Sequence, residues 1–343
     1  MIPSDAFRES LALFFEPIAP FLADGDVSEI MINGCEEIWV ERRGVLSLTD
    51  AAFPSREALD AALTNVAQFE GRPFDAAHPI LEAHLPDGSR LEAVIPPLAA
   101  GGPAVAIRRF SRAALTTEQL LKGGSLSPDA AGFLARVVAA RKNILVSGGT
   151  GSGKTSLLAA LSRFVPDGER IVVIEDTREL KLQKRHVVYL TARAADERGR
   201  GQVAIRDLLR ATLRLRPDRI VVGEVRGAEA IDLVQAMTTG HGGSMTTVHA
   251  SSPVGALRRL ETMALMDDTG LPLKALRAQI ASAVDLVVQV ARVSSGHRLV
   301  TAVGHVRGLT PQGDYAVCDL FSRGRGGPLE RARRADKAKG AQA

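Results

Sequence analysis

The chain has 343 residues, of which 45% are hydrophobic and 24% charged, so it can form two globular domains with ordinary apolar cores. Its formal charge of +4 comes from the end of the chain: residues 322–343 carry a net +5, which leaves residues 1–321 at −1. A near-neutral body with only 4% aromatic residues offers little basic or stacking surface, which argues against a nucleic-acid-binding protein. We expect the tail to be solvated and disordered, with weak attraction to an anionic membrane surface as the alternative.

The two cysteines and the lengths of the hydrophobic runs indicate in which cellular compartment the protein works. Cys35 and Cys318 are far apart, and no C-x-x-C or Cys/His spacing occurs, so neither a metal site nor a disulfide framework is indicated. No apolar run approaches the roughly 20 residues that span a bilayer, and charged residues near the N-terminus interrupt any signal-peptide core. We therefore expect a cytoplasmic protein that reaches a membrane only through partners.

The first part of the chain mixes helical and strand patterns. Apolar spacing predicts helices over 7–23 and 56–69 and strands over 27–34, 37–41, 91–95 and 104–110. These elements predict a small α+β domain over residues 1–110. A linker over 111–127 follows, in which a short helix begins near Thr116.

Strands and helices alternate in the second part, which we place at 128–321, before the tail at 322–343. A helix over 129–141 comes first. Strands are then predicted over 143–147, 171–174, 219–222, 245–249 and 284–290, and helices over 156–161, 205–215, 228–237 and 253–266. This alternation predicts an α/β domain with a mostly parallel sheet and helices on both faces.

A glycine-rich stretch after the first of these strands fits the phosphate-binding pattern G-x-x-x-x-G-K-[ST]. Its residues are Gly148, Gly149, Thr150, Gly151, Ser152, Gly153, Lys154 and Thr155, and Ser156 follows them in the helix. The strand–loop–helix context turns backbone N–H groups toward one anion, and the helix N-terminus adds its partial positive charge. We expect Lys154 to contact the β- and γ-phosphates of a nucleotide and the Thr155 hydroxyl to bind Mg²⁺.

Acidic residues follow two of the predicted strands, where an α/β nucleotide fold places its chemistry. Glu175 and Asp176 follow one strand, and Glu224 follows another in a Walker B pattern. Hydrolysis needs one carboxylate near Mg²⁺ and one that activates water. The alternative is that these acids pair with Arg178 and Arg226. An extra strand between the P-loop and Walker B strands is typical of RecA-like ATPases.

Histidines and arginines supply further candidates. His249 ends a predicted strand within reach of the γ-phosphate, and we expect it to couple phosphate loss to domain movement; His241 is the weaker candidate. Arginines could reach the phosphates of a neighbouring subunit. The candidates are Arg206, Arg210 and Arg214 on one helix face, and Arg90, Arg108 and Arg109 in the first domain. The sequence does not choose among them.

Four blocks in order resemble the secretion ATPases of type II and type IV systems. They are the Walker A loop at 148–155, the acidic box at 174–180, an atypical Walker B at 215–226 and a His box at 239–250. Residues 27–34 and 106–110 look most like the branch that serves Tad-type pili and conjugal transfer. The N-terminal extension common in the pilus branch is short here, and the tetracysteine zinc insert of some type II members is absent, which argues against a general type II system.

The resemblance implies an ATPase that binds ATP and Mg²⁺ and forms a homohexameric ring. This ring lies on the cytoplasmic face of the inner membrane, docked on a platform protein. It implies that Lys154 and Thr155 hold phosphate and metal, that Glu175 and Glu224 are catalytic and Mg²⁺-associated carboxylates, and that His249 belongs to the coupling element. Arg90, Arg108 and Arg109 match positions that face the nucleotide. The competing hypotheses are a RecA-like nucleic-acid motor, a nucleotide-dependent scaffold with little turnover, and a small-molecule kinase.

Overall fold

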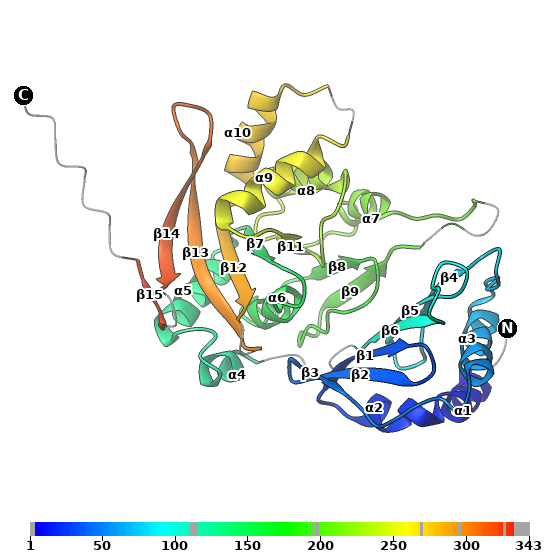
Figure 1. The fold of residues 1–343 in the computed structure, drawn as a ribbon. Helices are drawn as coiled ribbons and strands as arrows, with labels where there is room; N and C mark the ends of the chain where they lie inside the picture. Colours follow the sequence, from blue (N-terminus) through cyan, green and yellow to red (C-terminus); the bar gives the residue numbers. More distant parts are fainter. Residues whose placement is uncertain are drawn as a thin grey trace, which may run out of the picture. The chain divides into compact units, whose positions relative to one another are not determined.

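The computed structural model describes residues 4–109, 116–193, 195, 199–267, 270–293, 296–324 and 327–332. The chain divides into two compact units, residues 1–113 and 114–343. Each unit has its own sheet, drawn in Figure 1.

The first unit is built on a six-stranded antiparallel sheet with the order β3-β2-β1-β6-β5-β4. Its strands are β1 Val27–Asn33, β2 Glu37–Arg42, β3 Val45–Leu48, β4 Ile80–His84, β5 Arg90–Val94 and β6 Ala104–Arg108. Alternate side chains, such as Leu91 and Ala93 of β5, are buried against helix α3 Arg56–Glu70, because successive residues of a strand point to opposite faces. The Ser55 hydroxyl caps α3 by accepting from the Ala58 N–H.

The predicted single helix over 7–23 is wrong. The structure has α1 Ser4–Phe14, a 3-10 turn at Glu16–Ile18 and a short α2 Ala19–Ala23. Pro17 and Pro20 each occupy an early position of the element that follows the break. Since proline has no N–H to donate and clashes with the preceding turn, a continuous helix cannot pass through this segment.

The second unit is built on a nine-stranded sheet with the order β15-β14-β13-β12-β7-β11-β10-β8-β9. From β12 to β9 the strands are parallel, and β13 to β15 add an antiparallel edge. The strands are β7 Ile144–Gly148, β8 Ile171–Glu175, β9 Val187–Thr191, β10 Arg219–Val222, β11 Met245–His249, β12 Leu286–Arg292, β13 Arg298–Leu309, β14 Tyr315–Arg323 and β15 Leu329–Arg331. This confirms the α/β class with a mostly parallel sheet.

Helices cover both faces of this sheet, as predicted (Figure 1). On one face lie α4 Thr117–Lys122, α5 Pro128–Ala139 and α6 Lys154–Ser162, and on the other α7 Ile205–Thr212, α8 Glu229–Thr238, α9 Pro253–Ala264 and α10 Leu273–Ala283. Successive side chains of strand β7 point to opposite faces of the sheet. Ile144 and Val146 face the first group of helices, and Leu145 faces the second. The parallel strands β7, β8, β10 and β11 all end at the same edge of the sheet, so that edge holds the residues that follow them.

The segments predicted as linker and tail contribute to the second unit. Helix α4 begins at a capping box of Thr116 and Gln119, and its Leu120 belongs to the core of this unit. The prediction of a disordered tail from Ser322 is wrong for its first part. Strand β14 runs to Arg323, whose guanidinium donates to the carbonyls of Val300 and Gly327, and the Leu329 side chain of β15 is buried. The rest of the tail, 333–343, and Phe110 lie outside the described residues.

A buried polar cluster joins helices α9 and α10 to strand β14. Both Arg277 Nε and the Tyr315 hydroxyl donate to Glu261 Oε2, at 2.9 Å each, and Arg277 Nη2 donates to Oε1 at 3.2 Å. Burial, followed by the hydrogen bond to Glu261, raises the pKa of Tyr315. The cluster therefore depends on one carboxylate that satisfies two partners.

Replacing Glu261 with alanine is expected to destabilise the second unit by about 3 kcal/mol, because it leaves Arg277 without its charge partner and the Tyr315 hydroxyl without an acceptor. The matched control on the same helix is Arg258→Ala, which removes an exposed pair with Asp314 (3.5 Å) and should cost less than about 1 kcal/mol. Denaturant unfolding followed by circular dichroism measures both changes. Equal losses in the two variants would contradict a special role for Glu261.

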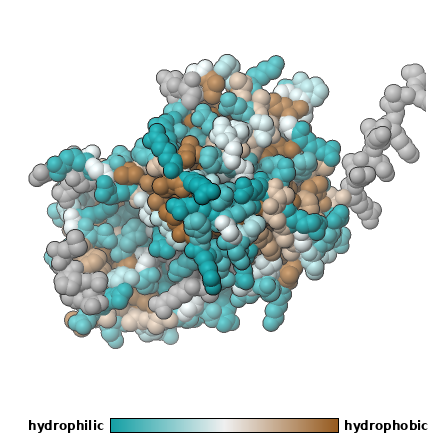
Figure 2. Space-filling model, turned by 180° about the vertical axis from the view of Figure 1, so that it is seen from behind, coloured by the Kyte–Doolittle hydropathy of each residue, from teal (hydrophilic) through white to brown (hydrophobic). Residues whose placement is uncertain are grey.

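Helix length and surface hydropathy bear on whether the protein can enter a membrane. Among the described residues no helix is both long and apolar enough to cross a bilayer. On the face drawn in Figure 2, hydrophobic residues form small groups separated by hydrophilic ones.

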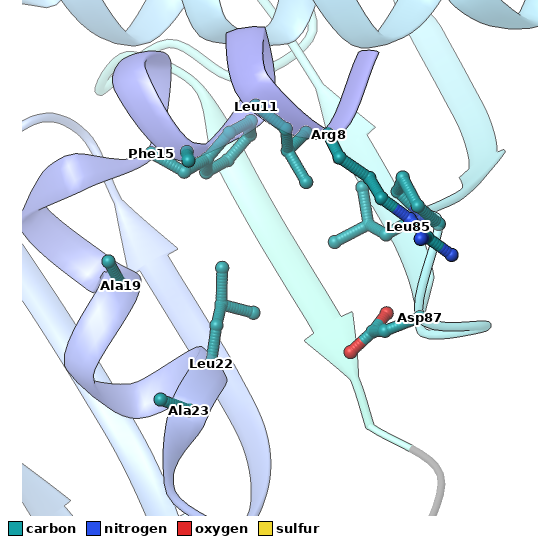
Figure 3. Close-up of a pocket in the computed structure, with 10 residues that line it drawn as sticks. Arg8, Leu11, Phe15, Ala19, Leu22, Ala23, Leu85 and Asp87 are labelled. Atoms are coloured by element: carbon teal, nitrogen blue, oxygen red, sulfur yellow. The ribbon is translucent and has the colours of Figure 1, made fainter. Parts of the chain in front are cut away.

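The first unit has a mainly apolar pocket beside α1 and α2, lined among others by Leu11, Phe15, Leu22 and Leu85, with Asp87 at its side (Figure 3). None of the residues predicted to contact nucleotide lines it.

Candidate functional site: the P-loop edge of the second sheet

The glycine-rich loop has the shape that an anion site requires. It runs from β7 to the first residue of α6, Lys154, and passes through Gly151 and Gly153 with φ of +66° and +91°, a conformation that favours glycine. A Cβ at Gly148 would lie only 2.8 Å from Val290 Cγ2, so the loop also begins where no side chain fits. Thr155 and Ser156 follow in the first turn of α6, where backbone N–H groups are free of intrahelical partners. The loop and the helix N-terminus together give the backbone geometry and the positive partial charge that favour an anion.

Lys154, His249 and Glu224 come together at this edge. Lys154 follows β7 through the loop, Glu224 follows β10, and His249 ends β11. Lys154 Nζ lies 3.0 Å from the Gly149 carbonyl oxygen and 3.2 Å from His249 Nε2. His249 Nε2 in turn lies 2.7 Å from Glu224 Oε1. The Lys154 residue is only 8% exposed and the Glu224 side chain 16%, so both charges are partly shielded from water. These are the residues that the sequence predicted for the terminal phosphate.

The two contacts of His249 Nε2 need different protonation states. A proton on Nε2 donates to Glu224, whereas a lone pair on Nε2 accepts from the Lys154 ammonium. In this structure the 3.2 Å contact with Lys154 has hydrogen-bond geometry, whereas Glu224 Oε1 lies 2.7 Å from Nε2 without forming a hydrogen bond. Burial lowers the pKa of His249, the nearby Glu224 charge raises it, and Lys154 lowers it further. His249 can therefore exchange one partner for the other by shifting a single proton.

Glu224 is also held by Arg226. Arg226 Nη2 and Nε donate to Glu224 Oε2 at 2.7 and 3.0 Å, and Arg226 Nη1 lies 3.6 Å from Asp176 Oδ2. The alternative given above, that these acids pair with a neighbouring arginine, is thus realised for Glu224 and Asp176 with Arg226. It does not remove Glu224 from the site, since the other carboxylate oxygen faces His249.

Glu175 ends β8 and is buried, with 4% of its surface exposed. One of its oxygens accepts from the N–H groups of Glu179 and Leu180, at 3.1 and 2.9 Å. Burial raises the pKa of Glu175 to about 7, against the opposing effect of these hydrogen bonds. Its Cγ would lie 2.8 Å from a Cβ at Gly223, so the Glu175 side chain packs against the residue that precedes Glu224 and follows the adjacent strand β10. A carboxyl group with this pKa suits proton transfer near neutral pH.

His241 is not part of this cluster. It lies in the turn before β11, whereas His249 ends that strand, which places about 13 Å of strand between the two positions. The turn is held at the opposite end of the sheet, where Asn143 Oδ1 accepts from the N–H groups of Gly243 and Ser244 at 2.8 and 3.0 Å.

The arginines of α7 are engaged within the unit. Arg206 makes a two-pronged contact with Asp267 (2.6 and 2.7 Å) and also lies 2.7 Å from Asp232 Oδ2, while Arg210 Nε lies 3.1 Å from Asp232 Oδ1. These pairs tie α7 to α8 and to the end of α9. Arg206 and Arg210 therefore have ion-pair partners in their own unit, whereas Arg214 lies beyond the end of α7.

The first-unit arginines have local contacts of their own. Arg90 Nη2 lies 2.6 Å from Glu82 Oε1. Arg108 is exposed and stands between Arg90 of β5 and Glu29 of β1 in the antiparallel ladders. Arg109 Nη1 donates to the carbonyls of Phe21, Asp24 and Val27 and so fixes the turn between α2 and β1. The predicted nucleotide contacts of these three arginines stay predictions.

Three residues near the P-loop escaped the sequence analysis. Arg298, at the start of β13, donates from Nε to the Gly151 carbonyl at 2.9 Å, and Arg292 ends the neighbouring strand. Gln289 of β12 accepts from the Ser147 hydroxyl and donates to the Ala250 carbonyl at 3.1 Å, so it links β7 to the residue after His249. No motif marks these positions. The pairing of β12 with β7 and of β13 with β12 brings them to the loop.

Comparison with known proteins assigns the family. A model of the family described as "Type II/IV secretion system protein" matches residues 14–330. The type IV secretion system protein PtlH of Bordetella pertussis is 36% identical over 309 residues, covering 83% of this chain and 91% of PtlH. The conjugal transfer protein TrbB of Rhizobium radiobacter is 35% identical over 292 residues, covering 84% and 86% of the two chains. A Mycobacterium tuberculosis protein with the provisional name conjugal transfer protein is 38% identical over 296 residues, covering 84% of each.

Solved structures agree on the fold. The Legionella pneumophila ATPase DotB has a TM-score of 0.59 and 21% identity, over 84% of this chain and 79% of DotB. The pilus retraction motor PilT, solved with ADP, has a TM-score of 0.56 and 20% identity, over 95% and 83% of the two chains. The fold is therefore that of the ATPase DotB and of the pilus retraction motor PilT. With the family match spanning nearly all of the described residues, the chain belongs to the type II/IV secretion system protein family.

Proposed function

We propose that this protein hydrolyses ATP to ADP and phosphate and uses the energy to drive Tad-type pilus assembly, type II or IV secretion, or conjugal transfer. The observation that carries the proposal is the contact series from Lys154 through His249 to Glu224 at the P-loop edge. A phosphate-binding loop and a shielded carboxylate are groups that phosphate-anhydride hydrolysis uses, and the histidine lies between them. Conjugal transfer and type IV secretion relatives support the transport role.

Each site residue has a proposed task. Lys154 and the loop residues 148–153, with Thr155 and Ser156, hold the phosphates. Glu175 accepts the proton of the attacking water, because burial gives it a pKa of about 7. His249 changes its hydrogen-bond partner as Lys154 turns to the phosphate, and this exchange couples the site to the rest of β11. Arg90, Arg108 and Arg109 are the candidates for nucleotide contacts from the first unit.

The residues present fit a magnesium ion held jointly with the nucleotide. The Thr155 hydroxyl and the Glu224 carboxylate are hard oxygen donors, with Glu175 as a further candidate, and Mg²⁺ typically binds through one or two such groups plus phosphates and water. Among the described residues no cluster of three or more His, Cys, Asp or Glu could hold a metal by itself, which agrees with a shared site. When bound, the ion neutralises charge that develops on the phosphates.

We propose further that the protein works as a homohexameric ring in the cytoplasm, docked on an inner-membrane platform protein. Phosphate release per subunit, measured over a range of protein concentrations with Lys154→Ala as the blank, tests both proposals. Activity that rises with concentration would support sites completed by neighbouring subunits. A flat rate from a particle that sizes as a monomer would contradict the ring, and no release above the blank, with membranes from the source cell added, would contradict the ATPase.

Hydrolysis is expected to rise with pH through about 7. A general base must be ionised to act, and burial raises the pKa of Glu175 to about 7, so the protonated, inactive form dominates below that pH. Glu175→Gln should lower kcat/KM about 100-fold or more and remove this rise. Glu179→Gln removes a negative charge that raises the pKa of Glu175, so it should move the midpoint to lower pH and keep the plateau. A wild-type midpoint near the ordinary glutamate value of about 4.3 would contradict the assignment.

A further inference from the structure

We propose that Gln289 is a positioning residue for the hydrolysis step. Its buried side-chain amide holds the segment after His249 against the strand that leads into the P-loop, and this tie keeps the His249 imidazole within reach of Lys154 and Glu224. The inference rests on the proposed function and adds to it a residue on β12, two strands away from the β11 strand that His249 ends. No motif of the sequence identifies Gln289.

Gln289 is a polar residue within an apolar strand. It belongs to β12, in which residues 286–288 and 290 are apolar and buried, and only 6% of its own surface is exposed. Val287, two residues earlier on the same face of the strand, is packed in the core that helices α7 to α10 cover. A buried amide costs free energy unless it is hydrogen-bonded, so the partners of Gln289 account for its presence there.

The Gln289 amide joins two segments at the P-loop edge of the sheet. Its Nε2 donates to the Ala250 carbonyl at 3.1 Å, and its Oε1 accepts from the Ser147 hydroxyl. A carbonyl oxygen can only accept, so the contact with Ala250 fixes which end of the amide carries the N–H groups, and Ser147 must then be the donor. Ser147 directly precedes the P-loop, and Ala250 directly follows His249. One side chain thus links the start of the loop to the end of β11.

Side-chain contacts hold the backbone on both sides of His249. The parallel ladder between β11 and β7 ends at His249, and the chain then turns toward α9. Before His249, the Thr247 hydroxyl donates to the Gly223 carbonyl at 2.8 Å, which ties β11 to the residue after β10. After His249, the Ala250 carbonyl is held by Gln289. The His249 side chain is itself 41% exposed, so the placement of its imidazole depends on where the backbone is held.

The two contacts predict an effect on the hydrolysis step. Ser147 and Ala250 both lie outside residues 148–156, which hold the phosphates in the proposed function. Loss of the amide should therefore leave nucleotide binding intact and let the segment after β11 move. The imidazole would then spend less time in contact with Lys154 and Glu224. A displacement of about 1 Å near the reacting groups can slow a chemical step up to about 100-fold.

The test is steady-state ATP hydrolysis by the full chain for wild type, Gln289→Met and Thr301→Val. Methionine is unbranched like glutamine and fills the same space without the two hydrogen bonds. Gln289→Met should lower kcat about tenfold and leave the KM for ATP, and the ADP affinity measured by calorimetry, within about twofold. Thr301→Val is the matched control. The Thr301 hydroxyl donates to the backbone carbonyl of Gln289 at 3.4 Å, so its loss leaves the amide in place and should leave kcat unchanged.

A double-mutant cycle with His249→Ala separates this role from a structural one. If Gln289 acts through His249, adding Gln289→Met to His249→Ala should change kcat by less than about twofold, because the group that the amide positions is already gone. A purely structural defect would lower kcat by the same factor in both backgrounds. A loss that persists in full in the His249→Ala background, an unchanged kcat in Gln289→Met, or an ADP affinity that falls as much as kcat would overturn the inference.

Hydrogen exchange followed by mass spectrometry tests the tie without relying on hydrolysis. Backbone amides of residues 247–256 should exchange faster in Gln289→Met than in wild type or Thr301→Val, while peptides from the first unit should be unchanged. Equal exchange over 247–256 in the three proteins, with an active wild type, would overturn the positioning role alone. Absence of hydrolysis by the wild type would overturn the proposed function, and the positioning role with it.

Discussion

Lys154→Ala is expected to lower ATP hydrolysis at least about 100-fold and to weaken nucleotide binding. The residue is 8% exposed, begins α6 and holds its ammonium group 3.0 Å from the Gly149 carbonyl and 3.2 Å from His249. A charge fixed in a shielded loop stabilises the negative charge of the transferring phosphate more strongly than one in open water. Alanine removes that charge and keeps the helix, because it is the best helix former.

The matched control is Lys142→Ala. Lys142 lies just before the strand that leads into the P-loop, and its Nζ contacts Asp285 Oδ1 at 2.9 Å with half of its side chain exposed. Its loss should leave hydrolysis within about fivefold of wild type, since exposed pairs contribute little. Phosphate release and ADP calorimetry on both variants, with melting temperatures to confirm folding, measure the difference. Hydrolysis by a folded Lys154→Ala protein at the Lys142→Ala rate would place the catalytic site elsewhere in the chain.

The parts of the site carried by local patterns could be predicted from the sequence. A glycine-rich turn between an apolar strand and a helix specifies the loop by itself, because its glycines and Lys154 act within eight residues. Glu224 and His249 could be placed because parallel strands end at one edge of a sheet. The structure adds what spacing does not contain, namely that one imidazole nitrogen lies between Lys154 and Glu224.

Long-range pairing accounts for what the sequence analysis missed. Strands β13 to β15 extend the sheet by antiparallel pairing, and only this pairing brings Arg298 to Gly151, 147 residues earlier in the chain. Arg109 has a structural role that no motif marks, because its guanidinium bonds to three backbone carbonyls of its own unit. The break in the predicted 7–23 helix has a local cause instead, because Pro17 and Pro20 lie at the starts of the 3-10 turn and of α2.

Glu224→Gln is expected to retain ATP and to hydrolyse it about 100-fold more slowly. Glutamine has nearly the same shape, so the loop and Lys154 can still bind the phosphates. It lacks the negative charge that faces His249 Nε2 at 2.7 Å and Arg226 Nη2 at 2.7 Å. Without that charge the site loses its proposed magnesium ligand, and His249 loses the carboxylate that could accept a proton from its Nε2. The imidazole then keeps its contact with Lys154, which competes with the phosphate for the ammonium group.

Asp176→Asn separates this effect from the loss of a partner for Arg226. Asp176 lies 3.6 Å from the same guanidinium but is about half exposed, so its amide variant should change the rate by less than about fivefold. Single-turnover phosphate release and ATP retention on a filter, measured for both variants, distinguish binding from chemistry. Equal rates in the two variants would show that both carboxylates serve only to hold Arg226. A slow Glu224→Gln protein that also fails to retain ATP would move Glu224 from the chemical step to nucleotide binding, because the missing charge would then act before the phosphate bond breaks.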